Sequence, residues 1–419
     1  MTDVRPNIGR RRGDSAIRLA YVTAVPQTQW EFLRGQNEYL RARGFEIYAI
    51  ASPGPWLPKL AARDGVRTYP VPISRRVAPL EDAVTLLRLF RVLRRIAPDI
   101  VHVSTPKAAL LAGLAAWAAR VPVRVFLDRG SLTEGTSGLK RTVLRAIERL
   151  TAALCHRTIC VSPSQLAFLR AEGILGPDEG VVMANGMSNG VDTTRFRPWE
   201  TAEHPGPPPD LAPALAGAAR EPGATIVGFV GRLGRDKGIE QLARAWQRIR
   251  DDFPRAHLLL VGAWEQDRRV PAAWRDALDR DPRVHQTGRV DDVVPYYRLM
   301  SVCVFPSYRE GFPNVPMEAA AMGLPVVATQ VVGCVDAVVD GETGTLVPPR
   351  DAATLAVAMA RYLRDPELGR RHGTAGRARV LRDFPQEPIW EALAAEYRRL
   401  LYARARASRA HTLVSQAAR

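Results

Sequence analysis

Hydrophobic and polar positions alternate with a regular rhythm in the first half of the chain. Short apolar runs predict buried parallel strands, and longer segments with apolar residues three or four positions apart predict helices. The predicted strands are Ile17–Val22, Glu46–Ala51, Ile100–Val103, Val123–Leu127 and Thr158–Val161. The predicted helices are Trp30–Arg43, Pro79–Arg95, Lys107–Ala119 and Leu139–Ala153. This alternation indicates a parallel sheet with helices on both faces.

The same rhythm restarts after residue 223. Strands are predicted at Ile226–Val230, His257–Val261, Val284–Thr287, Val302–Pro306, Pro325–Ala328 and Gly344–Val347. Helices are predicted at Ile239–Arg250, Ala272–Asp279, Pro316–Met322 and Ala352–Arg364, followed by an amphipathic helix at Glu387–Tyr402. The second half therefore predicts another parallel α/β sheet of similar size.

A segment rich in proline and glycine, Glu200–Gly223, separates the two halves and predicts an interdomain linker. We predict an α/β protein with two Rossmann-like, doubly wound domains that face a cleft. The predicted N-terminal domain covers residues 15–200, the linker 201–223 and the C-terminal domain 224–385. A C-terminal helix over 386–405 packs back on the N-terminal domain. In such sheets, ligands bind beyond the carboxyl ends of the strands.

The composition excludes several classes of protein. The 419 residues are 46% hydrophobic and 24% charged, which excludes a disordered tail protein. The longest apolar run, Ala108–Ala119, is shorter than the roughly 18 residues of a membrane-spanning helix. The first residues lack the apolar region of a secretory signal, and the four cysteines lack zinc-site or disulfide spacing. We therefore expect a cytoplasmic, metal-free protein with reduced cysteines.

The charge indicates an anionic partner. Lysine and arginine number 59 against 43 aspartates and glutamates, a net charge of +16, and residues 1–205 carry +11 of it. This balance suits phosphorylated substrates, an acidic membrane surface or nucleic acid. The alternative is an arginine-rich composition without functional meaning.

The segment Gly228–Gly238 is the first candidate for chemistry. An apolar strand leads into a glycine-rich turn with Gly231, Arg232 and Lys237, and a helix then begins. Exposed amides, a helix N-terminus and two cations form a site for a diphosphate. The Walker A spacing and its hydroxyl are missing. By itself, this segment could also be a solvated loop.

The segment Tyr308–Glu318 is the second candidate. Glu310 lies in the loop after an apolar strand, and Glu318 lies eight residues further on, inside a predicted helix. A carboxylate in such a loop can accept hydrogen bonds from sugar hydroxyls or stabilise a cationic sugar, and one on the helix suits ribose hydroxyls. The alternative for Glu318 is the exposed face of a short helix.

Together, the two segments are far more specific than either alone. The Glu-x7-Glu pattern after a strand, some seventy residues beyond Gly-Arg-x4-Lys-Gly, resembles the retaining nucleotide-sugar glycosyltransferases of family 4 (group 1), with the GT-B fold. The segments His102–Lys107, Asn185–Asp192, Gly323–Thr329 and Gly333–Pro349 are similar to the branch that builds bacterial surface glycans on polyprenyl-diphosphate carriers. The resemblance covers most of the chain. It implies that the N-terminal domain, residues 15–200, binds the acceptor and that the C-terminal domain, residues 224–385, binds the nucleotide-sugar donor.

The resemblance implies a set of donor-binding residues. Arg232 and Lys237 would hold the donor diphosphate, Glu310 the transferred sugar and Glu318 the ribose. The backbone at Arg289 and Val290 would read the base. The full implied donor set is Gly231, Arg232, Lys237, Arg289, Val290, Glu310, Gly311, Phe312, Pro313, Asn314 and Glu318.

The N-terminal half departs from the family in one place. Many members carry a histidine near the sugar, where this chain has Asp128-Arg129-Gly130. Asp128 therefore joins Glu310, Arg232 and Lys237 as a candidate catalytic residue.

Three further features are interpreted more simply. Because His102 lies at a predicted strand end, we interpret it as a packing residue rather than as a contact to an acceptor. Asp279 and Asp281 have the spacing of a metal-dependent sugar transferase but precede a proline at a helix end, which predicts surface residues. The helix Asp82–Arg95 places leucines among four arginines, which predicts either a helix on an anionic membrane or a surface helix with its leucines in the core.

These observations favour an enzyme that moves a hexose or N-acetylhexosamine from a UDP-sugar to a lipid-linked saccharide or a small-molecule acceptor. It would need no metal or other cofactor and would not bind nucleic acid. A peripheral position on the inner face of the membrane would fit a lipid-linked acceptor. The alternatives are a sugar-nucleotide epimerase of the same fold and a non-catalytic basic binding protein, although neither acid–base residues nor a basic stripe with aromatics can be placed for them.

Overall fold

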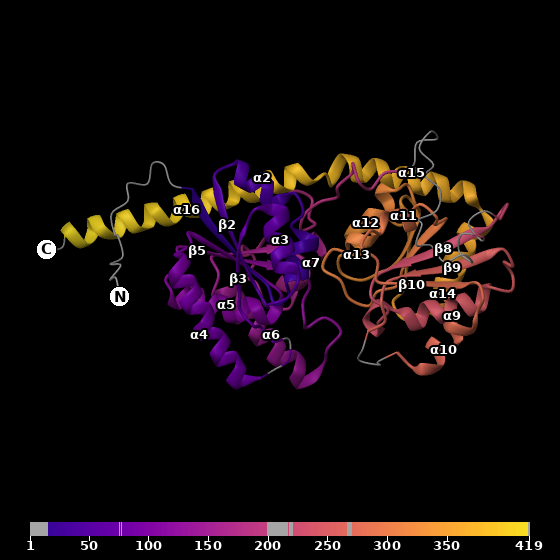
Figure 1. Cartoon of the computed structure of the whole chain (residues 1–419), viewed down its shortest axis with the longest axis horizontal. Helices are drawn as coiled ribbons and strands as arrows, with labels where there is room; N and C mark the ends of the chain where they lie inside the picture. Colours follow the sequence, from indigo (N-terminus) through magenta and orange to yellow (C-terminus); the bar gives the residue numbers. More distant parts are fainter. Residues whose placement is uncertain are drawn as a thin grey trace. The chain divides into compact units, whose positions relative to one another are not determined.

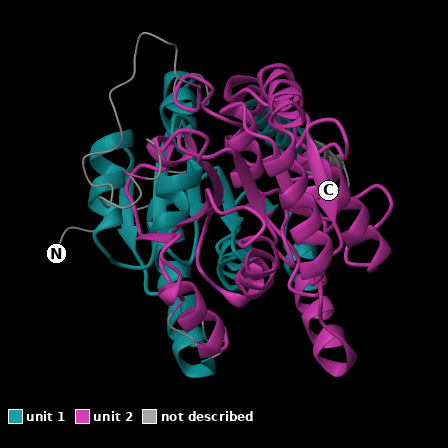
Figure 2. Cartoon of the chain, turned by 90° about the vertical axis from the view of Figure 1, so that its right-hand side faces the viewer, with its two compact units in different colours: residues 1–127, 150–157, 393–419 teal, residues 128–149, 158–392 magenta. Residues whose placement is uncertain are grey.

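The computed structural model describes residues 16–74, 76, 78–198, 217, 221–265 and 270–417 (Figure 1). Most of the predicted linker, residues 201–223, lies outside the described residues. The chain divides into two compact units (Figure 2). Unit 1 consists of Met1–Leu127, Leu150–Arg157 and Leu393–Arg419, and unit 2 of Asp128–Arg149 and Thr158–Ala392.

The first half forms the predicted parallel sheet, with seven strands in the order β3-β2-β1-β4-β5-β6-β7. Its strands are β1 Ile17–Val22, β2 Phe45–Ala51, β3 Arg67–Pro70, β4 Ile100–Ser104, β5 Val123–Asp128, β6 Arg157–Cys160 and β7 Val181–Val182. The central strands are almost fully buried because helices cover both of their faces. The short strand β3 was not predicted, since Arg67–Pro70 is at most half-buried and has no apolar run.

Among the residues that the structure describes, seven helices accompany this sheet. They are α1 Pro26–Phe32, α2 Gln36–Ala42, α3 Trp56–Asp64, α4 Pro79–Ile96, α5 Pro106–Ala118, α6 Gly138–Ala153 and α7 Pro163–Ala171. The single helix predicted over Trp30–Arg43 is wrong, because the chain breaks into α1 and α2 at Gly35, whose φ of 78° interrupts a helix.

The arginine-rich helix α4 turns most of its leucines inward. Leu89 and Leu93 are fully buried, and Leu86 and Phe90 pack against the same core. Of the five apolar residues in the predicted membrane pattern, only Leu87 is exposed, to 54%. The core-facing alternative is therefore confirmed for most of this helix.

The last helix, α16 (Gln386–Ala417), contributes its second part to unit 1. Tyr397 is fully buried, and its hydroxyl lies 2.5 Å from Nδ1 of His102 in β4. Arg398 donates a hydrogen bond to the carbonyl of Arg43. His102 is 3% exposed, so the packing interpretation of this residue is confirmed. Among the described residues, none of the helices is both long and apolar enough to cross a membrane.

The second half forms a six-stranded sheet in the order β10-β9-β8-β11-β12-β13. Its strands are β8 Thr225–Val230, β9 Ala256–Val261, β10 Val284–Gly288, β11 Val302–Phe305, β12 Val326–Thr329 and β13 Gly344–Val347. Its helices include η1 Arg235–Lys237, α9 Ile239–Ile249, α10 Ala272–Arg280, α11 Val294–Tyr297, α12 Asn314–Ala321, α13 Cys334–Ala337, α14 Ala352–Arg364 and α15 Pro366–Asp383. All neighbouring strands of this sheet pair in parallel.

The order of the second sheet reverses at β8. The chain first adds β9 and β10 on one side of β8 and then places β11 on its other side. The loops after β8 and β11 therefore leave the same sheet edge in opposite directions. This topological switch point is where doubly wound sheets bind ligands, and both candidate segments of the sequence begin there.

Candidate active site

The loop after β8 carries Arg232 and Lys237. It ends in the single 3₁₀ turn η1 and the left-handed Gly238, which has a φ of 70°. A Cβ atom on Gly238 would lie 2.0 Å from the carbonyl oxygen of Pro306, so only glycine allows this close approach. The amide of Tyr308 donates to the carbonyl of Asp236 at 2.8 Å. The loop is thus fixed against the segment that follows β11.

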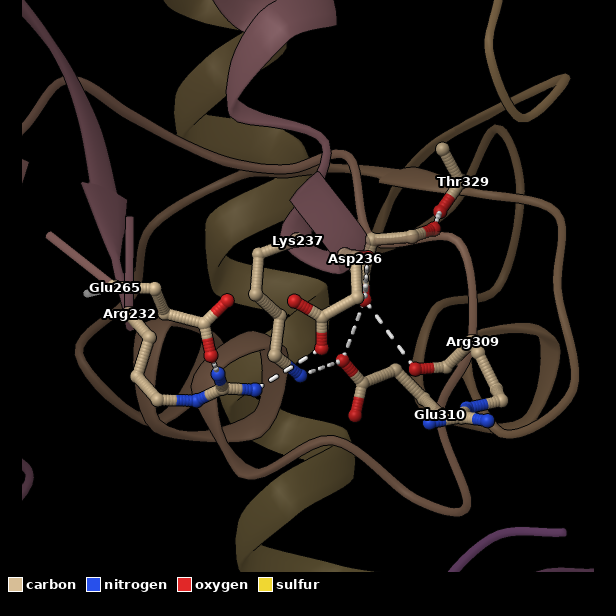
Figure 3. Close-up of polar contacts among 8 residues, drawn as sticks. Arg232, Asp236, Lys237, Glu265, Arg309, Glu310 and Thr329 are labelled. Atoms are coloured by element: carbon tan, nitrogen blue, oxygen red, sulfur yellow. Dashed lines mark hydrogen bonds and ion pairs between the residues drawn. The ribbon is translucent and has the colours of Figure 1, made fainter. Parts of the chain in front are cut away.

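The two sequence motifs meet in an ion pair. Lys237 Nζ lies 2.5 Å from Glu310 Oε1, and the hydroxyl of Ser307 donates to the same oxygen at 2.6 Å (Figure 3). The Lys237 and Glu310 side chains are only 19% and 13% exposed. Thr329, at the end of β12, donates in turn to the Ser307 carbonyl. The pair is therefore held in place by three adjacent strands.

Arg232 lies beside this pair and is held by two carboxylates. It contacts Glu265, and its guanidinium lies 3.0 Å from Asp236 Oδ2 (Figure 3). Sequence reasoning did not single out Glu265. Its position just after β9, the neighbour of β8, is the signal that would have found it. Because Arg232 is 52% exposed, an incoming diphosphate could compete for its donors.

The backbone from Gly311 to Asn314 leads into α12. Gly311, Phe312 and Pro313 are buried, and α12 begins at Asn314. Because Pro313 has no N–H, this stretch can offer at most the other three amides to a ligand. The ring of Phe312 packs on Phe384 with centroids 5.4 Å apart. Its side chain is therefore used for packing.

Glu318 lies inside α12 and is half-buried. The hydroxyl of Tyr297 donates to its Oε2 at 2.9 Å. Burial, followed by the charge of Glu318, raises the pKa of Tyr297 well above its usual value, so the phenol stays protonated. The alternative of a purely exposed helix face is therefore wrong for Glu318.

Arg289 and Val290 directly follow β10, the edge strand of the sheet. Arg289 is exposed and Val290 half-buried. Since all neighbouring strand pairs are parallel, this segment leaves the sheet at the same edge as the loops after β8 and β11. Its role with a nucleotide base stays a prediction.

Asp128 ends β5 and is 3% exposed. Its Oδ1 accepts hydrogen bonds from the Gly130 amide at 2.8 Å and from Gln165 at 3.2 Å. Burial raises its pKa to about 7, against the effect of these two donors. This carboxyl fixes the start of the loop after β5, and its catalytic role stays a prediction.

The prediction that Asp279 and Asp281 lie on the surface is confirmed for Asp279 and wrong for Asp281. Asp279 is exposed, but Asp281 is buried and accepts hydrogen bonds from Trp246 at 2.9 Å and Arg250 at 2.7 Å. These partners explain its burial and keep its pKa low despite the opposing effect of desolvation. Among the residues that the structure describes, no group of three or more His, Cys, Asp or Glu side chains could hold a metal ion.

Comparisons with known proteins agree with this architecture. The family described as "Glycosyl transferases group 1" matches residues 224–365, and the "Glycosyl transferase 4-like domain" matches residues 29–186. The capsular polysaccharide biosynthesis glycosyltransferase CapM of Staphylococcus aureus is 30% identical over 373 residues, which cover 88% of this chain and 94% of CapM.

Two further relatives support the same assignment. An Escherichia coli enzyme named UDP-Gal:alpha-D-GlcNAc-diphosphoundecaprenol alpha-1,3-galactosyltransferase is 26% identical, over 73% of this chain and 77% of its own length. The solved structure of sucrose-phosphate synthase from Thermosynechococcus elongatus is 25% identical and superimposes with a TM-score of 0.72, covering 92% of this chain and all of that chain. The chain is therefore a glycosyltransferase with the GT-B fold and belongs to the group 1 glycosyl transferases.

Proposed function

We propose that this enzyme moves a hexose or N-acetylhexosamine, with retention, from a UDP-sugar to a hydroxyl of a lipid-linked saccharide or a small-molecule acceptor in glycan or metabolite biosynthesis. The observation that carries the proposal is the Lys237–Glu310 pair at the switch point of the second sheet. It joins a cation suited to a phosphate with a carboxylate suited to a sugar. The UDP donor and lipid-diphosphate acceptor are those named for the Escherichia coli relative.

Arg232 and Lys237 would act on the leaving group. As the bond between the anomeric carbon and the phosphate oxygen breaks, negative charge grows on the diphosphate, and nearby cations stabilise it. A metal would not be required, since two cations and the amides near α12 supply the positive field. Both cations already pair with carboxylates, so the diphosphate must replace or share these partners. The interaction of Arg232 and Lys237 with the diphosphate is therefore strongest when the negative charge on the diphosphate is largest.

Retention follows if the acceptor attacks from the face on which the diphosphate leaves. The acceptor oxygen bonds to the anomeric carbon, and its proton passes to a diphosphate oxygen. Glu310 would stabilise the positive charge that develops on the sugar. This route needs no protein nucleophile.

The test is release of UDP that depends on an added acceptor. A thermal-shift screen against UDP-, GDP- and dTDP-sugars comes first, since a donor that fits the base site stabilises the folded chain. The stabilising donor is then incubated with and without GlcNAc-diphospho-undecaprenol. Sugar transfer with an unchanged anomeric configuration supports the proposal. Release of UDP that is independent of every acceptor tried, or inversion of configuration, contradicts it.

We also propose that the enzyme docks on an anionic membrane, where a lipid-linked acceptor would lie. In α4, Leu89 and Leu93 are buried in the core, and the exposed Leu80, Val84 and Leu87 lie beside the exposed, acidic Glu81. We therefore take α6 as the better candidate. Leu139, Val143 and Leu150 are 80%, 50% and 48% exposed and follow each other at helical spacing on one side of α6. The exposed charged residues of α6 are all cations: Lys140, Arg141, Arg145 and Arg149. An exposed apolar stripe flanked by cations is typical of helices that lie on anionic lipid.

Co-sedimentation with vesicles tests this surface. Binding should require anionic lipid and weaken with salt, because each arginine contributes on the order of 1 kcal/mol near an acidic leaflet. Replacing Leu139 and Val143 by Ser should release the protein, whereas replacing Arg91 and Arg94 of α4 by Gln serves as the matched control. Equal binding by the α6 variant and the wild type would exclude this role for α6.

A further inference from the structure

The loop after β5, residues 129–137, carries a carboxylate that the proposed chemistry does not use. Two buried carboxylates fix the base of this loop in unit 2. Asp128 accepts the Gly130 amide, and Glu148 accepts the Ser131 hydroxyl at 2.7 Å and the Leu132 amide at 2.5 Å. The amide of Thr136 then donates to the Thr133 carbonyl at 3.0 Å and closes a turn. Glu134 lies in this turn, so its backbone is held in place.

Glu134 lies close to the Lys237–Glu310 pair. Its carboxylate accepts a hydrogen bond from the Val332 amide and is within electrostatic range of Arg309 and Glu310. The buried thiol of Cys334 is within range of Glu134, Glu310 and Lys237 together. Three charged side chains therefore surround the start of α13.

The backbones of the two loops also approach closely. A Cβ atom on Gly311 would lie only 2.2 Å from the carbonyl oxygen of Arg129. The hydroxyl of Ser162 donates to the Gly311 carbonyl at 2.7 Å. The loop after β5 is thus packed directly against the residue that follows Glu310.

One oxygen of Glu134 is left without a partner in this arrangement. Its Oε2 is buried, and no hydrogen-bond donor reaches it among the residues that the structure describes. A buried carboxylate oxygen without a donor is unfavourable, and a ligand hydroxyl that donates to it would remove this cost. The position beside Glu310 suits such a ligand.

We propose that Glu134 Oε2 accepts a hydrogen bond from a sugar hydroxyl bound beside Glu310 and Lys237. The inference rests on the proposed function, because it takes this pair as the place of sugar transfer. The hydroxyl belongs either to the transferred sugar or to the acceptor sugar, which present the same donor chemistry. Glu134 is then a substrate-binding residue contributed by the loop after β5.

The ionised carboxylate is the better acceptor for a hydroxyl. Burial and the charge of Glu310 raise the pKa of Glu134 to about 7, although Arg309 and the Val332 amide act in the opposite direction. Transfer by the wild type should therefore rise as the pH increases through about 7. The variant Glu134→Gln should lose this rise.

The experiment uses the full chain with Glu134→Ala and Glu134→Gln. Calorimetry measures the affinities for UDP and for the stabilising UDP-sugar. Transfer kinetics are measured with GlcNAc-diphospho-undecaprenol as the acceptor. UDP lacks the transferred sugar, so its affinity should not change. Loss of a hydrogen bond to a charged group costs about tenfold or more in binding. A tenfold loss in UDP-sugar affinity assigns the hydroxyl to the transferred sugar, whereas a tenfold rise in the acceptor KM assigns it to the acceptor.

Glu148→Gln is the matched control, because Glu148 holds the same loop through hydrogen bonds from the Ser131 hydroxyl and the Leu132 amide. It should lower the melting temperature, whereas Glu134→Ala should not. The inference is wrong if both Glu134 variants keep wild-type UDP-sugar affinity, acceptor KM and pH profile. It is also wrong if the Glu134 variants lose UDP affinity and, like Glu148→Gln, have a lower melting temperature. A wild type that binds UDP-sugars but transfers nothing contradicts the proposed function instead, and the comparison of UDP-sugar with UDP then decides the role of Glu134.

Discussion

The two sheets each have a switch point, and the two points differ in chemistry. In the first sheet it lies between β1 and β4, where the Ala24 amide donates to Thr105 Oγ1 at 3.2 Å. Nearby, the buried Gln29 donates to Thr23 Oγ1 at 3.0 Å and to the Ile50 carbonyl at 3.1 Å. These groups are uncharged and bond to one another.

The switch point of the second sheet, between β8 and β11, holds ion pairs instead. Lys237 and Glu310 are paired and largely buried, and Arg232 is paired and half-exposed. Topology alone therefore does not identify a site for a charged substrate. The side chains that follow the strands decide it. Among the described residues, the loops after β8 and β11 bring Lys237 and Glu310 together, whereas Lys107, which follows β4, pairs with Asp82 of α4.

The largest expected effect is at the second switch point. Replacing Arg232 or Lys237 by Ala should cost about 2–4 kcal/mol of transition-state stabilisation, because charge on the leaving diphosphate loses a cation. The measurement is kcat/KM with the UDP-sugar. Arg244→Ala, which removes an exposed arginine paired with Glu240 on α9, is the matched control. Wild-type kcat/KM in both variants, with UDP binding intact, would exclude the assignment.

The two glutamates of this site should respond differently. Glu310→Gln should mainly lower kcat, because the transferred sugar that Glu310 would stabilise carries positive charge only as the glycosidic bond breaks. Glu318→Ala should weaken the binding of donor and free UDP alike, if its carboxylate contacts the ribose. The same calorimetric titration of UDP measures both variants. An equal loss of UDP affinity in the two contradicts this division of roles.

A change at the first switch point should affect stability rather than donor binding. Gln29→Ala leaves buried polar groups without a partner and should cost about 1–3 kcal/mol of the free energy of unfolding. Denaturant titration measures this loss. UDP affinity should stay at the wild-type value, and a marked fall would show that the contrast between the two switch points is false.

The smallest expected effect is that of metal removal. Excess EDTA should leave transfer largely unchanged, because the proposed mechanism relies on Arg232 and Lys237 for positive charge. Initial rates with and without EDTA measure this. A complete loss of activity that Mn²⁺ restores would instead require a metal site and would turn attention to Asp279.

The local pattern of apolar and charged residues was sufficient to predict most strands of the second sheet. The apolar strands before Gly231 and Pro306 are continuous, and the charged residues follow directly after them, so strand ends and candidate residues could be predicted together. The break between α1 and α2 was missed because apolar spacing continues across Gly35, while only its positive φ interrupts the helix. The orientation of α4 was left open because leucines beside arginines fit both a core and a membrane.

The sequence by itself determined that strands and helices alternate, because these patterns have periods of two to four residues. It also determined that Arg232, Lys237 and Glu310 follow strand ends and that Glu318 lies on the next helix. Only the tertiary structure decided which charges meet. The Lys237–Glu310 pair joins residues 73 positions apart, and Glu265 reaches Arg232 because β9 happens to lie beside β8. Burial was decided there as well: Asp281 is enclosed because Trp246 and Arg250 surround it, and such partners have no trace in the local pattern.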